Sequence, residues 1–117
     1  MDADELKART KQFALQVMQL IDRLPNTTKG RVVANQLMKS ATSVGANYRA
    51  ACRGRSQAEF ISKLSIVLEE SDECCYWLEL IMEGGLIPAE QVADLYREAN
   101  EITAIMTASH KTACNNR

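Results

Sequence analysis

Histidine is almost absent from this sequence of 117 residues, because His110 is the only one. A di-iron bundle needs Glu-x-x-His pairs on two helices, and haem and zinc sites are also commonly built on histidine. Cysteine or serine nucleophiles would lack a convincing histidine base as well. The composition therefore disfavours enzymes. We expect no catalytic residue, no metal, no cofactor and no small-molecule substrate, and a solvated His110.

Cysteine is present but without the spacing of a metal or redox motif. None of the four residues Cys52, Cys74, Cys75 and Cys114 belongs to a C-x-x-C pair. Adjacent residues on a helix point about 100° apart, so Cys74 and Cys75 would not bridge each other. We expect four reduced thiols, with Cys75 inside the core. A redox role for them stays an open question.

Other signals are missing as well. No apolar run approaches the roughly 18 residues that span a bilayer, and neither glycine-rich phosphate-loop motif occurs. The N-terminal sequence MDADELKARTKQ is acidic and polar, whereas a secretory signal is basic and then apolar. No segment of strand length alternates apolar and polar residues. These absences predict a cytoplasmic, all-α protein without a membrane segment.

Apolar residues recur at spacings of three and four in four segments, which is the pattern of amphipathic helices. The predicted helices cover about 4–24, 28–53, 56–83 and 88–110, and the polar tail 111–117 is expected to fray. We predict one domain over 1–117, an antiparallel up-down-up-down four-helix bundle with left-handed packing. The predicted inner stripes contain Leu6, Phe13, Val17, Leu20 and Leu24; Val33, Leu37, Ser40, Val44, Tyr48 and Ala51; Ile61, Leu64, Leu68, Ser71, Cys75, Leu78 and Met82; and Val92, Leu95, Ala99, Ile102 and Met106. The third stripe is expected to be widened by Phe60, Val67, Cys74 and Ile81.

Turn and cap residues separate these helices. Pro25 interrupts the first helical pattern, and a threonine at 27 or 28 is expected to cap the next helix. Gly54 is expected to stop the second helix in the left-handed conformation. The run from Ser56 to Glu59 has the form of a capping box, in which serine caps and glutamate reaches back. Gly84-Gly85 ends the third helix, and Pro88 suits the first position of the fourth.

The charges are divided between two regions of the chain. Residues 29–63 contain seven basic side chains and one acidic one, whereas residues 69–101 contain ten acidic side chains and one basic one. The net charges of these regions are +6 and −9. The net charge of −1 for the whole chain conceals this separation.

Two interpretations of these outer faces stay open besides simple solvation. The first is self-association: an apolar line through an acidic helix face would contact another copy of the chain, as a head-to-tail contact that closes into a ring. Its expected interface residues are Ile66, Glu70, Glu73, Trp77 and Leu80. The second is the binding of RNA or DNA phosphates by a basic face. Its expected contact residues are Arg31, Lys39, Arg49, Arg53, Arg55 and Lys63.

The stretch SVGANYRAACRGRSQAEFISKLSIVLEESDECCYWLEL, with IMTASHKTA near the end of the chain, resembles the 23S rRNA-intervening sequence protein family of bacterial four-helix bundles. The sequence departs from the family pattern at Cys74-Cys75, where Thr-Glu is usual. The resemblance implies a non-enzymatic protein that assembles into a homopentameric ring. It also implies kinship with accessory proteins of diversity-generating retroelements, which bind nucleic acid. The cellular role of the family is not settled.

Overall fold

A computed structural model describes residues 1–116, and these contain only helices and connections. The elements are α1 (Ala3–Ile21), α2 (Thr28–Cys52), α3 (Gln57–Glu83), the 3₁₀ turn η1 (Ala89–Gln91) and α4 (Ala93–Asn115). The predicted all-α class with four long helices is confirmed. Within the described residues, no helix has the length and apolar character required to cross a bilayer.

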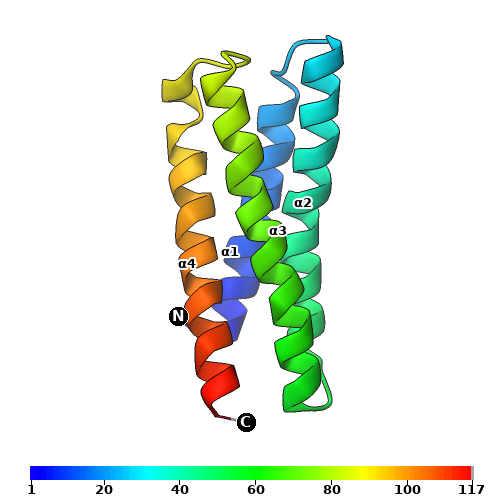
Figure 1. Ribbon diagram of the computed structural model, residues 1–117, viewed down its shortest axis with the longest axis vertical. Helices are drawn as coiled ribbons and strands as arrows, with labels where there is room; N and C mark the ends of the chain where they lie inside the picture. Colours follow the sequence, from blue (N-terminus) through cyan, green and yellow to red (C-terminus); the bar gives the residue numbers. More distant parts are fainter. Residues whose placement is uncertain (117) are drawn as a thin grey trace.

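The four helices lie side by side along a body of 46 × 21 × 20 Å. Figure 1 shows the α1–α2 and α3–α4 connections at one end, and the α2–α3 connection with the end of α4 at the other. Each helix contacts the next one in the chain, and α1 also contacts α4. The contact between α2 and α3 is the most extensive, and the one between α1 and α4 is the least. The bundle is therefore packed most closely between α2 and α3 and most loosely between α1 and α4.

Both predicted helix caps form. The Thr27 hydroxyl accepts the Gly30 N–H at 3.2 Å, and the Ser56 hydroxyl accepts the Glu59 N–H at 3.1 Å. The Glu59 carboxylate also reaches back, but it accepts the N–H of Arg55 at 2.7 Å, one residue before the cap. The capping residues were correctly identified, and only the second bond of the box differs.

The prediction for Gly54 was wrong. Gly85, with a φ of 68°, is the only described residue in the left-handed conformation. Helix α2 instead ends through Arg53, whose N–H donates to carbonyls of the last turn while its φ stays at −95°. A helix can end by tightening its last turn in this way without a positive φ.

The ends of the first and last helices also differ from the prediction. Helix α1 ends at Ile21, so Leu24 lies in the turn that follows. Pro88 precedes η1, and the regular helix starts only at Ala93. The tail was expected to fray from Lys111, but α4 continues to Asn115. The physical reason is that Ala113 is buried and its carbonyl accepts the Gln57 side-chain amide at 3.1 Å.

The core follows the predicted stripes, although Leu24 and Leu95 are only partly buried. In α3 the buried arc is wide, as predicted, because this helix packs against both α2 and α4. Val67, Cys74 and Ile81 are fully buried, whereas the predicted core residues Leu68 and Met82 are only partly so. The fully buried side chains of largest volume are Phe13, Leu37, Leu64, Leu78, Ile81, Ile102 and Met106.

Gly45 lies at a close contact between α1 and α2. A β-carbon at this position would lie 3.4 Å from the Thr10 hydroxyl oxygen. Helices α1 and α2 therefore approach closely at this point. The absence of a side chain at Gly45 also leaves space between α1 and α2 at the surface of the molecule.

Candidate functional site

The five predicted self-association residues lie on the outward side of α3: Ile66, Glu70, Glu73, Trp77 and Leu80. We call these residues, together with Tyr76, the α3 face. Ile66 and Trp77 are half-buried, and 37 % of Leu80 is exposed. The Trp77 indole packs partly against the core and donates its Nε1–H to a Glu73 carboxylate oxygen at 3.3 Å. Apolar side chains of α3 therefore do reach the surface, although Trp77 is less exposed than the sequence suggested.

Tyr76 was missed in the sequence. It is 54 % exposed and lies edge-on to Trp77, with ring centroids 5.2 Å apart. Two adjacent aromatic residues on a helix were a usable signal, because one of them had to lie closer to solvent than the other. Tyr76 enlarges the aromatic part of the α3 face.

The carboxylates of the α3 face are crowded. Burial raises the pKa of Glu70 above its ordinary value, and the neighbouring charge of Glu73 raises it further. The Ser40 hydroxyl and the charge of Lys39 act in the opposite direction. The α3 face therefore carries negative charge that its own chain compensates only in part.

The six predicted nucleic-acid contacts are all exposed. Within residues 1–116 none of them forms an ion pair. Four of them lie in or near the α2–α3 connection: Arg49, Arg53, Arg55 and Lys63. Arg31 lies near the other end of α2, where its guanidinium donates to the Asn26 side chain at 3.0 Å, and Lys39 lies between them. The structure thus brings four of the six residues to one end of the bundle and leaves two apart.

A groove between α1 and α2, which we call the α1/α2 groove, was not predicted. It has a volume of about 290 Å³. Leu15 and Met18 are 44 % and 38 % exposed beside it, although they are large and apolar. The charged residues of its lining are all basic. The lining consists of Lys7, Thr10, Lys11, Ala14, Leu15, Met18, Thr42, Gly45, Ala46 and Arg49.

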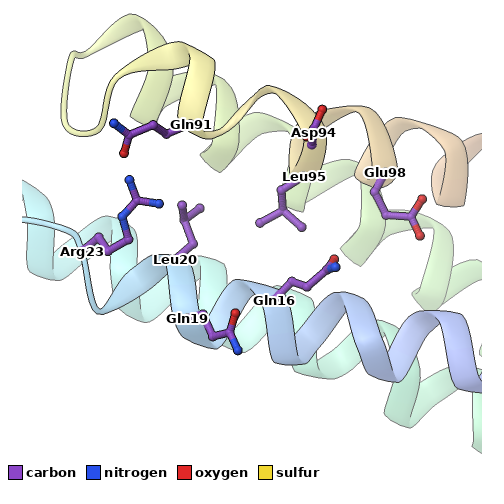
Figure 2. A pocket seen from close by; sticks show the side chains of 8 residues that line it. All are labelled: Gln16, Gln19, Leu20, Arg23, Gln91, Asp94, Leu95 and Glu98. Atoms are coloured by element: carbon purple, nitrogen blue, oxygen red, sulfur yellow. The ribbon is translucent and has the colours of Figure 1, made fainter.

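A second hollow follows the loose side of the bundle, between α1 and α4. We call it the α1/α4 seam, and its volume is about 490 Å³. Figure 2 shows Leu20 and Leu95 pointing toward each other across it, with Arg23 directed toward the η1 segment. Most of the remaining lining is polar: Gln16, Gln19, Gln91, Asp94 and Glu98.

An ion pair connects the two helices at the seam. The Arg9 guanidinium donates to both carboxylate oxygens of Glu98, at 2.7 and 2.6 Å, and to Glu101 at 3.3 Å. Only about a quarter of the Arg9 and Glu98 side chains is exposed (23 % and 25 %). The hydrogen bond to Glu98 raises the pKa of Arg9 above its ordinary value. The charge of Glu98 is therefore compensated within the chain.

His110 is not simply solvated, which corrects the prediction. Its Nε2 lies 2.9 Å from the Ser65 hydroxyl oxygen, and its Nδ1 lies 3.8 Å from the Cys114 sulfur. Ser65 and His110 are 45 residues apart in sequence, so this pairing had no local signal. The Ser65 hydroxyl also donates to the Ile61 carbonyl at 3.0 Å. With that donor already engaged, the pair is arranged as a contact between α3 and α4 and not as a nucleophile with its base.

All four cysteines are free thiols, and Cys75 lies in the core as predicted. Cys74 is buried even more completely, and burial raises the pKa of its thiol well above the ordinary value. In the described part of the chain, no group of three or more His, Cys, Asp and Glu side chains is placed to hold a metal ion.

Comparison with known proteins gives a family and a fold. The family described as 23S rRNA-intervening sequence protein matches residues 5–108. A crystal structure from Bacteroides thetaiotaomicron, described as a protein with unknown function from the S23 ribosomal protein family, is similar with a TM-score of 0.86. It is 35 % identical in sequence, and the alignment covers 95 % of this chain and 99 % of that one. No curated protein matches the sequence.

Proposed function

The chain belongs to the 23S rRNA-intervening sequence protein family, and from that premise we propose that it is a non-enzymatic interaction protein whose copies assemble into a ring. The family resemblance implies that the ring is a pentamer. The observation that carries the proposal is the α3 face, where Tyr76, Trp77 and Leu80 lie together beside two carboxylates. Exposed aromatic residues of this kind are typical of the centre of a protein interface.

The proposal includes the arrangement of the helices. We propose an up-down-up-down bundle with left-handed packing in a single domain. The course of the chain in Figure 1 supports it, since successive connections lie at alternate ends. In such a bundle α3 has α2 and α4 as neighbours and leaves one long side to a partner.

Light scattering coupled to gel filtration tests the assembly. We expect the unmodified chain to have a mass several times 13.0 kDa, and Tyr76→Glu/Leu80→Glu to be monomeric, because it places two charges in a desolvated contact. We call this double substitution the face variant. Both residues are outside the core cluster, so folding should be preserved. Trp77→Glu should act in the same direction, although it also removes a core contact.

Val32→Glu is the matched control, since Val32 is exposed on α2 and lies outside the α3 face. It should leave the mass unchanged, and circular dichroism should show the same helix content for every variant. A face variant that keeps the mass of the unmodified chain would contradict the proposed interface.

A second candidate function is the binding of nucleic acid, and the clustering of four exposed basic residues without ion pairs favours it. Arg49→Ala/Arg53→Ala/Arg55→Ala should then weaken binding to a single-stranded RNA probe. Binding through phosphates should also weaken steeply between 50 and about 200 mM salt. Tight binding that survives the triple substitution would refute this candidate, whereas assembly through the aromatic residues should persist at both salt concentrations.

A further inference from the structure

We infer that the α1/α2 groove is the acceptor for the α3 face of a second copy of this chain. This inference rests on the proposed self-assembly and specifies the second half of its contact. It assigns a binding role to Lys7, Lys11, Leu15 and Met18, which belong to neither of the surfaces predicted from the sequence.

Shape and exposed apolar surface are the first argument. The groove lies where Gly45 has no side chain and α1 approaches α2 closely at Thr10. Leu15 and Met18 stand exposed along one wall, and Ala14 and Ala46 complete an apolar lining. The α3 face offers apolar groups that could enter a groove, because Tyr76 and Leu80 are exposed on a single helix. Burying both surfaces against each other would remove apolar area from water on both sides.

Charge complementarity is the second argument and identifies the partner. The groove presents Lys7, Lys11 and Arg49 with no acidic residue in its lining. Within the described residues, the ion pair of Lys7 with the fully exposed Asp4, at 3.8 Å, is the only one that any of these three cations makes. The α3 face carries Glu70 and Glu73, whose mutual repulsion contributes to the raised pKa of Glu70. Cations from a neighbouring copy would relieve this repulsion, so the two surfaces fit each other in both charge and apolar character.

The position of the two surfaces favours a closed assembly. The groove opens between α1 and α2, and α3 follows α2 around the bundle, so the surfaces do not lie on opposite sides of the molecule. Successive copies joined in this way turn at each step, as a ring requires. Gly45 lies five residues beyond Ser40, the neighbour of Glu70, which is about 7.5 Å along α2. A closed ring allows no net displacement along its axis, so we expect neighbouring bundles to be tilted against each other by an amount that cancels this offset.

A mixing experiment tests this inference. The groove variant Leu15→Glu/Met18→Glu and the face variant should each be monomeric, because each lacks one half of the contact. A mixture of the two still contains one intact groove and one intact face. It should therefore form a complex of one copy of each, with twice the mass of the 13.0 kDa chain, and should not grow further.

Three results would overturn the inference. If the groove variant assembles like the unmodified chain, the groove is not the acceptor, and the proposed α3 interface can still stand. If both variants are monomeric but their mixture forms no complex, α3 faces contact each other or some other surface. If the unmodified chain is itself monomeric, the proposed function fails together with this inference. Val32→Glu serves again as the control, and circular dichroism verifies that each variant is folded.

Discussion

Helix α1 borders two hollows of different character. In the α1/α4 seam, Arg9 is held by Glu98 and Glu101, so basic and acidic groups of the same chain satisfy each other. In the α1/α2 groove the charged lining is entirely basic, and large apolar side chains stand exposed beside it. The seam is the larger hollow, but both of its carboxylates already have a partner in the chain, Glu98 in Arg9 and Asp94 in Arg97.

This difference shows that the volume of a hollow does not by itself indicate a binding site. A charge that is paired and partly buried within the chain contributes to folding and leaves little for a ligand. A groove whose cations have only one weak ion pair among them, and whose leucine and methionine are exposed, gains from a partner that brings carboxylates and apolar groups. We therefore assign the seam to stability and the groove to binding, and the following predictions test that assignment.

The largest effect is expected at Arg9. In the background of the monomeric face variant, Arg9→Met should lower the free energy of unfolding by about 2 kcal/mol, because it removes charged hydrogen bonds and leaves Glu98 without its partner. Urea unfolding measures this change. Lys11→Met in the groove is the matched control, with an expected change below about 0.5 kcal/mol. Equal losses at the two positions would remove the distinction between seam and groove.

Reversal of a groove charge should affect assembly and leave folding almost unchanged. Lys11→Glu should weaken self-association about tenfold. It removes an attraction to the carboxylates of the partner and adds a repulsion, each worth up to about 1 kcal/mol. Dilution series followed by light scattering would detect the shift. Lys111→Glu, an exposed change on α4 outside the groove lining, should have no effect. If both reversals weaken assembly alike, net charge alone governs it and the groove has no special role.

Gly45→Ala should move stability and assembly in opposite directions. The new β-carbon lies at 3.4 Å from the Thr10 hydroxyl oxygen, an ordinary contact. Alanine within a helix should therefore stabilise the monomeric background by about 0.5 to 1 kcal/mol. The methyl group also narrows the groove, so self-association in the otherwise unmodified chain should weaken. Thermal unfolding and light scattering measure the two effects, and a loss of stability would show that the close approach cannot accept a side chain.

The smallest effect is expected from Glu70→Gln and depends on pH. A carboxyl with a raised pKa in the folded chain stabilises that chain in acid, and this stabilisation is lost as the pH rises through the raised pKa. Removing the charge in the background of the groove variant, which cannot assemble, should thus raise the unfolding temperature at pH 7. The gain is on the order of 0.3 kcal/mol, because the substitution relieves the burial of the Glu70 charge and its like-charge pair with Glu73. It should vanish below the ordinary pKa of glutamate, and a gain that persists in acid would contradict the assigned cause.

The sequence predicts the helices of this molecule well, because helix signals are local. The capping side chains of Thr27 and Ser56 and the inner stripes of α1 and α2 are determined by residues three or four positions apart. The errors lie where a distant contact decides. Helix α4 continues past Lys111 because Ala113 packs into the bundle and binds Gln57, which is 56 residues away.

The sequence pointed to one of the two candidate surfaces, the α3 face, and missed the other, the α1/α2 groove. The α3 face could be found because its apolar residues follow the helical period on the side away from the core. The groove could not, since Lys7 and Lys11 on α1 meet Arg49 on α2 only after folding. The pairing of Arg9 with Glu98, across 89 residues, explains why the charge count alone did not distinguish a free cation from a satisfied one.

Native mass spectrometry of the unmodified chain tests the central claim most directly, because it counts the copies in the assembly. Self-assembly into a pentamer predicts one dominant species with five times the mass of the 13.0 kDa chain, about 65 kDa. A spectrum dominated by the single 13.0 kDa chain at micromolar concentration would contradict the proposal.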